Sequence, residues 1–188
     1  RARSVVESLR GLIDKNGYKC TLVAGNVATG DGARFLADAG ADIIKVGIGP
    51  GAACTTRVQT GVGVPQLSAV MECSDAMSDY LDVQVIADGG IKTPGDIAKA
   101  LAAGADAVMV GGMLARCVEA PGLVKEVDGV RLKQYRGMAS AAAGSRYVEG
   151  AEGWVPCDTD VGSVMTSISN GLQSAMSYVG ARKLDEFK

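Results

Sequence analysis

The chain has 188 residues, of which 47% are apolar and 26 are glycine, and its formal net charge is −2. This length and composition suffice for one packed core, and the near-neutral charge favours neither a nucleic-acid backbone nor an acidic membrane surface as a partner. Histidine is absent, which excludes a Ser-His-Asp or Cys-His mechanism contained in this chain.

The cysteines and the hydropathy pattern further limit the class of protein to which this chain can belong. Five cysteines are scattered along the chain without CxxC spacing. This pattern indicates reduced thiols and a cytoplasmic location rather than a disulfide framework or a zinc site. No apolar run is long enough to span a membrane, and no signal-peptide pattern opens the chain. Aromatic residues make up 4% of the chain, too few for a platform that stacks single-stranded nucleic acid.

Helical and strand patterns alternate as far as residue 110. Helices are predicted over residues 5–15, 31–39, 68–80 and 94–103, with Ser68 and Thr93 as the N-caps of the last two. Short buried strands are predicted over residues 21–27, 42–47, 83–87 and 107–110. Such strands between helices are typical of a parallel sheet covered by helices. Four such units do not close an eight-stranded barrel, so an open sheet and half of a barrel remain alternatives.

The pattern changes after residue 123. A hairpin around Asp128 and Gly129 is predicted within residues 126–135. A flap follows over about residues 133–157, with low periodicity over residues 137–156. An amphipathic helix over residues 161–178 closes the sequence.

The loop KVGIGPGAACTTR at residues 45–57 gives the strongest single signal for chemistry. It follows a predicted strand and presents the thiol of Cys54 beside the hydroxyls of Thr55 and Thr56 and the guanidinium of Arg57. Glycines allow a backbone to come close to a ligand, and a cysteine beside a cation can act as a nucleophile. The alternative interpretation is a surface loop with an incidental cysteine.

Other strand ends carry weaker signals. The carboxylate of Asp88, followed by Gly89 and Gly90, suits the hydroxyls of a ribose, but a tight turn capped by aspartate explains it equally well. Gly111 and Gly112 open a helical stretch after the next strand, where a phosphate is attracted. Asn26 is most simply a turn residue.

Three flap residues and three cysteines have ordinary interpretations when they are considered alone. Arg146, Tyr147 and Glu149 are most simply solvated loop residues, although Glu149 could transfer protons in a chain without histidine. The remaining cysteines in apolar or helical contexts are expected to be packing residues, namely Cys20, Cys73 and Cys117.

Together, the motifs resemble those of the IMP dehydrogenase/GMP reductase family. They follow the family's order along nearly the whole chain: GNVAT (25–29), KVGIGPGAACTTR (45–57), GVGVPQ (61–66), ADGGI (87–91), GDIAKALAAGADAVMVGG (95–112), YRGM (135–138) and VEG (148–150). The resemblance implies a (β/α)8 TIM barrel, of which this chain would be the C-terminal half. It also implies GMP or IMP as the substrate, a cysteine that attacks purine C2, and hydride exchange with NADPH or NAD.

The resemblance implies roles for individual residues as well. The catalytic residues would be the Cys54 nucleophile, the proton-transferring pair Thr56 and Glu149, and the water-activating pair Arg146 and Tyr147 of the dehydrogenases. The nucleotide would be bound at the ribose, phosphate and base by Asp88, Gly89, Gly90, Gly111, Gly112, Tyr135, Gly137 and Met138, with Glu149 also touching the base. Asn26 and Arg57 would line the nicotinamide region. The carbonyl groups of Gly49, Gly51 and Cys54 would hold a potassium ion.

The length of the flap decides which of the family's two activities is expected. The motifs PQLSAVMEC (65–73) and VGGMLA (110–115) resemble GMP reductases, whereas YRGM and the Arg146–Tyr147 pair resemble IMP dehydrogenases. A dehydrogenase needs a flap long enough to replace the dinucleotide and deliver water, and the segment between Met138 and Glu149 is short. GMP reductase is therefore the expected activity. IMP dehydrogenase, a non-catalytic nucleotide-binding module and an enzyme of modified purine nucleotides remain alternatives.

Two features depart from the family pattern. Ala52 stands where many members have a serine that touches phosphate. The first four strands of the expected barrel are not in this sequence, and a half barrel would leave two unpaired strand edges. The chain is therefore expected to be part of a longer protein or of a split assembly. The resemblance also implies a homo-oligomer, typically a tetramer.

Overall fold

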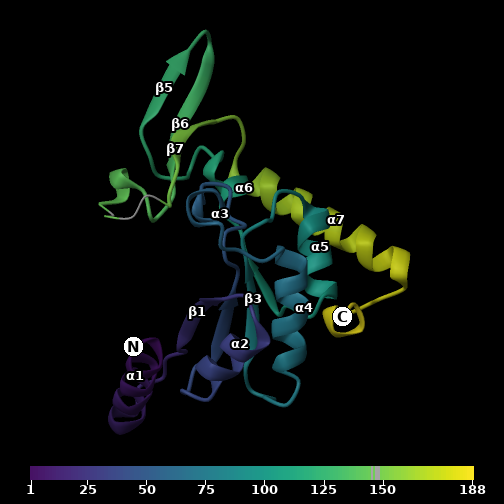
Figure 1. Ribbon diagram of the computed structural model, residues 1–188. Coiled ribbons are helices and arrows are strands. Elements are labelled where there is room, and N and C mark those ends of the chain that lie inside the picture. The colour runs from purple at the N-terminus through teal and green to yellow at the C-terminus, as the bar shows by residue number, and fades with distance from the viewer. Residues whose placement is uncertain (145, 147–148) are drawn as a thin grey trace.

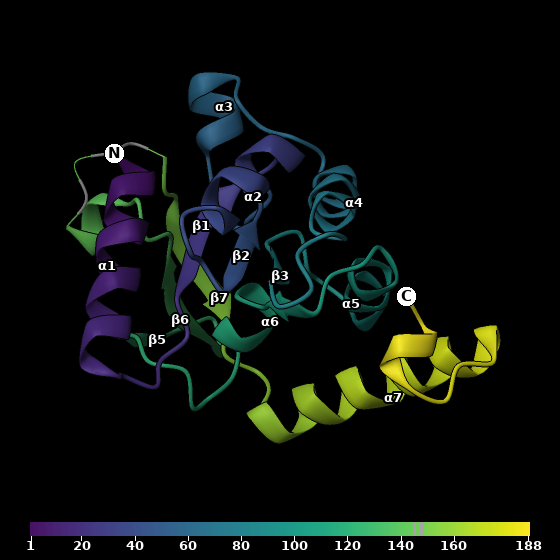
Figure 2. The same cartoon turned by 90° about the horizontal axis from the view of Figure 1, so that it is seen from below.

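A computed structural model describes residues 1–144, 146 and 149–188 (Figure 1). Its centre is a parallel sheet in which the strands follow the chain order, β1 (Val23–Val27), β2 (Ile43–Val46), β3 (Gln84–Asp88) and β4 (Ala107–Met109). One face of the sheet is covered by the helices between the strands, α2 (Gly30–Ala37), α4 (Gln66–Ala76) and α5 (Pro94–Ala102), as Figure 2 shows. The predicted α/β class and its strand–helix order are confirmed.

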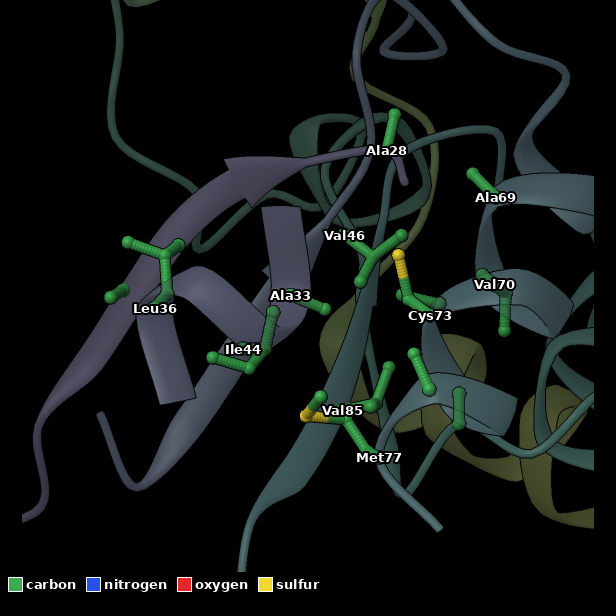
Figure 3. Packing of buried hydrophobic residues seen from close by; sticks show 14 of the residues in the cluster. Ala28, Ala33, Leu36, Ile44, Val46, Ala69, Val70, Cys73, Met77 and Val85 are labelled. Atoms are coloured by element: carbon green, nitrogen blue, oxygen red, sulfur yellow. The ribbon is translucent and has the colours of Figure 1, made fainter. Parts of the chain in front are cut away.

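The hydrophobic core lies between the sheet and these helices. Ile44 and Val85 are register partners on neighbouring strands, and both are buried. Figure 3 shows them facing buried side chains of α2 and α4, among them Leu36, Val70 and Cys73. Each such aliphatic side chain stabilises the fold by about 1.5–3 kcal/mol on full burial. This layer fixes which residues of each strand point away from the helices.

Within residues 1–144, 146 and 149–188, no helix layer covers the opposite face of the sheet (Figure 2). Lys45 and Ile86 are register partners there, and Met109 at the end of β4 is 43% exposed. Because side chains alternate along a strand, Lys45 lies on this face while its neighbours Ile44 and Val46 are buried in the core. The arrangement places a lysine and Asp88, the last residue of β3, on the same face.

The helix starts follow local capping chemistry, with one correction to the prediction. The Thr93 hydroxyl accepts a hydrogen bond from the backbone amide of Asp96, and the Asp96 carboxylate accepts one from the Thr93 amide, so α5 begins with a reciprocal capping box. Helix α4 begins earlier than predicted, with Pro65 as its N-cap, and Ser68 lies inside the helix. Proline, whose φ is −53° here, starts a helix readily because the first helical turn leaves its amide positions unpaired.

A second sheet follows the first. Its strands are β5 (Val124–Val127), β6 (Val130–Arg136) and β7 (Glu152–Pro156), all antiparallel. The predicted hairpin is confirmed, with Asp128 and Gly129 at positive φ in its turn. The prediction of low regularity over residues 137–156 is wrong for β7, which pairs with β6. Its long-range partner supplies the order that its own sequence does not show.

The remaining elements are mostly short. They are α1 (Ala2–Asn16), α3 (Thr56–Thr60), α6 (Gly112–Ala115), η1 (Ala141–Ala143), α7 (Val161–Val179) and η2 (Leu184–Glu186). Helix α7 packs on α5 and extends past it (Figures 1 and 2), and Gly171 lies so close to Pro94 that a Cβ there would be 2.4 Å from the proline ring. In the described part of the chain, no helix combines the length and apolar character that crossing a membrane requires.

Candidate active site

A cavity of about 520 Å³ lies where β2, β3 and β4 end, between the Cys54 loop, the turn before α6 and the start of the flap. Ligands of α/β folds bind at this edge of the sheet, and the volume suits a small molecule. The predicted site residues that line it are Gly51, Cys54, Thr56, Asp88, Gly89, Gly90, Gly111, Gly112, Tyr135, Gly137, Met138 and Glu149. Residues spread over most of the sequence thus meet in one cavity.

Cys54, Thr56 and Glu149 form a hydrogen-bonded chain. The Cys54 thiol donates to Thr56 Oγ1 at 3.2 Å, and the Thr56 hydroxyl donates to Glu149 Oε2 at 2.6 Å. A proton leaving the sulfur therefore has a continuous path through one hydroxyl to a carboxylate. A nucleophile linked to a base through hydrogen bonds is the arrangement that covalent catalysis requires.

Backbone pairing between the loop and the flap brings Glu149 to Thr56. The amide of Thr55 donates to the Glu149 carbonyl at 2.9 Å, and the amide of Ala151 donates to the Ala53 carbonyl at 2.8 Å. Cys54 and Gly150 form an antiparallel bridge between them. Glu149 is thus fixed to the Cys54 loop by its own main chain, although 93 positions separate it from Thr56 in sequence.

Asp88 is held from one side by two donors. Lys45 Nζ lies 2.8 Å from Asp88 Oδ2, and Asn26 Nδ2 donates to the same oxygen at 2.9 Å. Within the described residues no donor is paired with Oδ1, which suits hydroxyl groups of a ligand. Asn26 also donates to the carbonyl of Gly47 at 2.8 Å, so it joins β1 to the loop after β2.

Lys45 lines the cavity, and the sequence reasoning missed it. Its ammonium forms an ion pair with Asp88 on the face of the sheet that carries no helices. The available signal was a charged residue inside the short apolar strand β2, where an unpaired charge would be costly.

The strand ends come unusually close to one another. A Cβ on Gly47, whose φ is +148°, would lie 2.1 Å from the Asp88 carbonyl oxygen. Gln66 bridges the same two strand ends, because its Nε2 donates to the carbonyl groups of Val46 and Asp88. The ends of β2 and β3 are thereby joined through one side chain of α4.

The other end of the cavity is formed by Tyr135 and the turn before α6. A Cβ on Gly111 would lie 3.3 Å from the Tyr135 hydroxyl, so this hydroxyl stands against the glycine backbone. Gly137 packs on the Cys54 loop, where its Cβ would lie 2.9 Å from the Ala53 carbonyl oxygen. Met138 lines the cavity while remaining 90% exposed.

Several predicted site residues lie elsewhere. Arg57 donates from its guanidinium to the carbonyl groups of Ile48 and Val64, so it braces the loop internally. Arg146 is exposed. Tyr147 lies outside the described residues. Gly49, one of the three proposed potassium ligands, packs on the Arg57 side chain.

The cysteines and the possible metal ligands can also be placed. All five cysteines are free thiols, and Cys73, Cys117 and Cys157 are buried. Burial raises the pKa of the Cys73 thiol to about 11, which makes it unreactive at neutral pH. Cys20 is exposed rather than packed, because it lies in the connection before β1, outside any helix or strand. The described residues contain no cluster of acidic or cysteine side chains that could hold a metal ion.

Comparison with protein families and curated proteins gives a consistent result. The family model described as "IMP dehydrogenase / GMP reductase domain" matches residues 2–188. The chain is 48% identical over 191 residues to an inosine-5'-monophosphate dehydrogenase of Aquifex aeolicus, covering 94% of this chain and 39% of that protein. It is 50% identical over 175 residues to GMP reductase 2 of Homo sapiens, covering 88% of this chain and 50% of that protein.

A solved structure resembles the whole described fold. The crystal structure of a Trypanosoma brucei GMP reductase variant in complex with guanosine 5'-monophosphate has a TM-score of 0.91 and 44% sequence identity. The match covers 98% of this chain and 40% of the other chain. The present chain therefore spans half or less of the length of these relatives.

Proposed function

The chain belongs to the IMP dehydrogenase/GMP reductase family, and from this we propose that the protein reduces GMP with NADPH to IMP, ammonia and NADP⁺. The observation that carries the proposal is the hydrogen-bonded chain from Cys54 through Thr56 to Glu149 in a cavity that also contains Asp88. The chemistry matches the substrate, because replacing an amino group on purine C2 with hydride requires a nucleophile and a proton path.

The first half of the reaction uses this hydrogen-bonded chain directly. The Cys54 thiol passes its proton through the Thr56 hydroxyl to Glu149, and the sulfur bonds to purine C2 of GMP. The same path then returns protons to the amino group, the C2–N bond breaks, and ammonia leaves. The product of this half is a purine nucleotide bound covalently to Cys54.

The second half releases IMP. A reduced nicotinamide, when bound, supplies a hydride. C2 accepts this hydride, the C2–S bond breaks, and its electron pair returns to Cys54 as the thiolate. Asn26 lies on the Asp88 side of the cavity, where it is proposed to touch the cofactor, although its amide nitrogen already donates to Gly47 and Asp88. Arg57 would act by bracing the catalytic loop, because its guanidinium is occupied by backbone carbonyl groups.

The remaining cavity residues would bind the nucleotide. Asp88 Oδ1 would accept hydrogen bonds from the ribose hydroxyls, while Lys45 and Asn26 hold Oδ2. The glycine turns at residues 89–90 and 111–112, together with the Tyr135 hydroxyl, would bind the phosphate. Gly137 and Met138 would contact the base. Ala52 offers no hydroxyl to the phosphate, so Tyr135 has a larger share of that contact.

The reductase is favoured over the dehydrogenase by the flap. Arg146 is exposed and does not line the cavity that contains Cys54. A reductase needs no activated water, since ammonia leaves and hydride arrives. IMP dehydrogenase, in which Arg146 and Tyr147 would activate water, is the second candidate because relatives of both kinds are equally similar.

Two accessory features are proposed with the activity. Potassium would be held by the carbonyl oxygens of Gly49, Gly51 and Cys54. Gly51 O already accepts from the Cys54 amide at 3.0 Å, and a carbonyl oxygen has a second lone pair for an ion. The protein is also proposed to form a homotetramer.

The activity is tested with the full-length protein and both substrate pairs. We expect NADPH absorbance to fall when GMP is added, with ammonia released in equal amount. NADH formation from IMP and NAD without NADPH oxidation would assign the dehydrogenase. Tight binding of GMP without turnover of either pair would assign a binding module.

A further inference from the structure

We infer that Lys133, buried in the second sheet, is a positioning residue that holds β6 against the segment after α6 and so places the Tyr135 hydroxyl for the nucleotide phosphate. The inference rests on the proposed function, because it concerns how GMP is bound. Lys133 is not among the residues that line the cavity. Its effect on the site would be transmitted through the strand to which it belongs.

Lys133 is a fully buried lysine bonded only to main-chain carbonyl groups. Lys133 is 1% exposed to solvent. Its Nζ donates to the carbonyl oxygens of Cys117 at 2.5 Å, Val118 at 3.0 Å and Ala120 at 2.6 Å. An ammonium has three donors, so all are used. Among the described ion pairs none includes Lys133, so the groups that its ammonium contacts directly are carbonyl dipoles.

The segment after α6 wraps around the rest of this side chain. A Cβ on Gly122 would lie 3.4 Å from Lys133 Cγ and 3.0 Å from the Gln134 carbonyl oxygen. The amide of Gln134 donates to the Leu123 carbonyl at 2.9 Å. The same segment is tied to the connection before α7, because the Val118 amide donates to the Thr159 carbonyl. Lys133 is thus the centre around which residues 117–123 are folded.

Lys133 and Tyr135 act on the two ends of one short element. They are two positions apart on β6, so their side chains leave the strand on the same side. Tyr135 meets Gly111, which precedes α6, while Lys133 binds the carbonyl groups that follow α6. A displacement of β6 relative to this element would therefore move the Tyr135 hydroxyl away from the Gly111 turn.

A purely structural role predicts a different outcome. A lysine that only stabilised the fold would change the melting temperature and the amount of active protein, and would leave the preference of each active molecule for GMP over guanosine unchanged. A positioning role changes that preference, because guanosine lacks the phosphate that Tyr135 would contact.

The test compares GMP and guanosine binding in the full-length protein. The variants are Lys133→Met, Tyr135→Phe, the double variant, and Lys125→Met as the matched control. Lys125 is exposed on the neighbouring strand β5, with its ammonium 4.1 Å from the Trp154 ring centre. Dissociation constants are measured by equilibrium titration, and folding is checked by thermal melting. If Lys133→Met does not accumulate as folded protein, Gly122→Ala takes its place. The new methyl group would press on Lys133 and on the Gln134 carbonyl from the segment after α6.

We expect Lys133→Met, or Gly122→Ala in its place, to raise the Kd of GMP about tenfold, the effect of one lost hydrogen bond to a charged group. The guanosine Kd should change less than about twofold, and Lys125→Met should change neither value. In the double variant, adding Tyr135→Phe to Lys133→Met should raise the Kd of GMP little further, because the contact between Tyr135 and the phosphate is already lost. Equal changes for GMP and guanosine, no change, or fully additive effects would overturn the inference. Failure of the unmodified protein to bind GMP would instead reject the proposed function.

Discussion

At the scale of single residues, the thiol of Cys54 and the carboxylate of Glu149 are connected through one hydroxyl group. Cys54 and Thr56 are two residues apart in the loop after β2, whereas Glu149 belongs to the flap, so its partnership with Thr56 could not be assigned from the neighbouring sequence alone. What the sequence does contain is the type of each group. Without histidine, a carboxylate is the natural proton acceptor for the thiol.

Replacing Cys54 by alanine should abolish GMP reduction, because no other group near purine C2 can form the covalent intermediate. The measurement is NADPH oxidation with the purified full-length protein. Cys20→Ala is the matched control, because Cys20 is exposed and lies outside the cavity. Retained turnover in Cys54→Ala would show that the proposed mechanism is wrong.

Replacing Lys45 by methionine should raise the Kd of GMP about tenfold, since the Asp88 carboxylate loses its ion pair and its fixed orientation. The turnover of bound GMP should change much less, because Lys45 is not a member of the hydrogen-bonded chain from Cys54 to Glu149. Exposed Lys19 supplies the control, as Lys19→Met. Unchanged GMP affinity in Lys45→Met would show that Asn26 alone is enough to orient Asp88.

At the scale of elements, α5 shows how local chemistry fixes a helix start. The hydrogen bond from the Lys99 ammonium, followed by that from the Thr93 hydroxyl, lowers the pKa of Asp96 to about 2. Because this value is below the ordinary one of 3.8, the ionised carboxylate stabilises the folded state. The stabilisation is complete above about pH 4 and is lost as the pH falls towards 2.

Replacing Asp96 by asparagine should therefore lower the free energy of unfolding by about 1 kcal/mol at pH 7. The difference from the unmodified protein should shrink as the pH falls below about 4, and urea titrations at several pH values measure it. Asp31→Asn at the start of α2 is the control, because the Asp31 side chain is 99% exposed. A difference that persisted at pH 2 would indicate that shape, not charge, makes the contribution.

Elements with a clear apolar pattern or local turn and capping residues were predictable, whereas β7 and the exact start of α4 were not. Thr93 and Pro94 predict the start of α5, and Asp128 and Gly129 predict the turn of the hairpin between β5 and β6. Strand β7 was missed because its order depends on β6, and α4 was shifted because Pro65 outweighs Ser68 as a start. In the site, Lys45 was missed since its partner Asp88 comes from another strand.

At the scale of the whole molecule, one layer of helices on a four-stranded parallel sheet supplies the rigid support for the cavity. On the opposite face of the sheet, Lys45 and Asp88 form an ion pair and line the cavity. The Cys54 loop and the glycine turns at residues 89–90 and 111–112 all leave this sheet at one edge, so their relative positions depend on how firmly the core is packed.

Replacing Ile44 by alanine should test this dependence. Ile44 is fully buried in the middle of β2, and the change should lower the free energy of unfolding by about 2–5 kcal/mol. Thermal and urea unfolding measure the loss. Val58→Ala is the matched control, because Val58 is 85% exposed and should cost less than about 0.5 kcal/mol. Similar losses in the two variants would contradict the assignment of the core.

The backbone pairing of residues 149–151 with the Cys54 loop has a consequence for how such sites can diversify. Gly137 donates to the Ala151 carbonyl, and Ala151 donates to the Ala53 carbonyl, so both ends of the intervening segment are anchored at the same place. The length between two anchored ends can change at small entropic cost without moving either end. Insertions between residues 139 and 148 would therefore leave Glu149 at Thr56, so this segment can vary in length while the hydrogen-bonded chain from Cys54 to Glu149 stays in place.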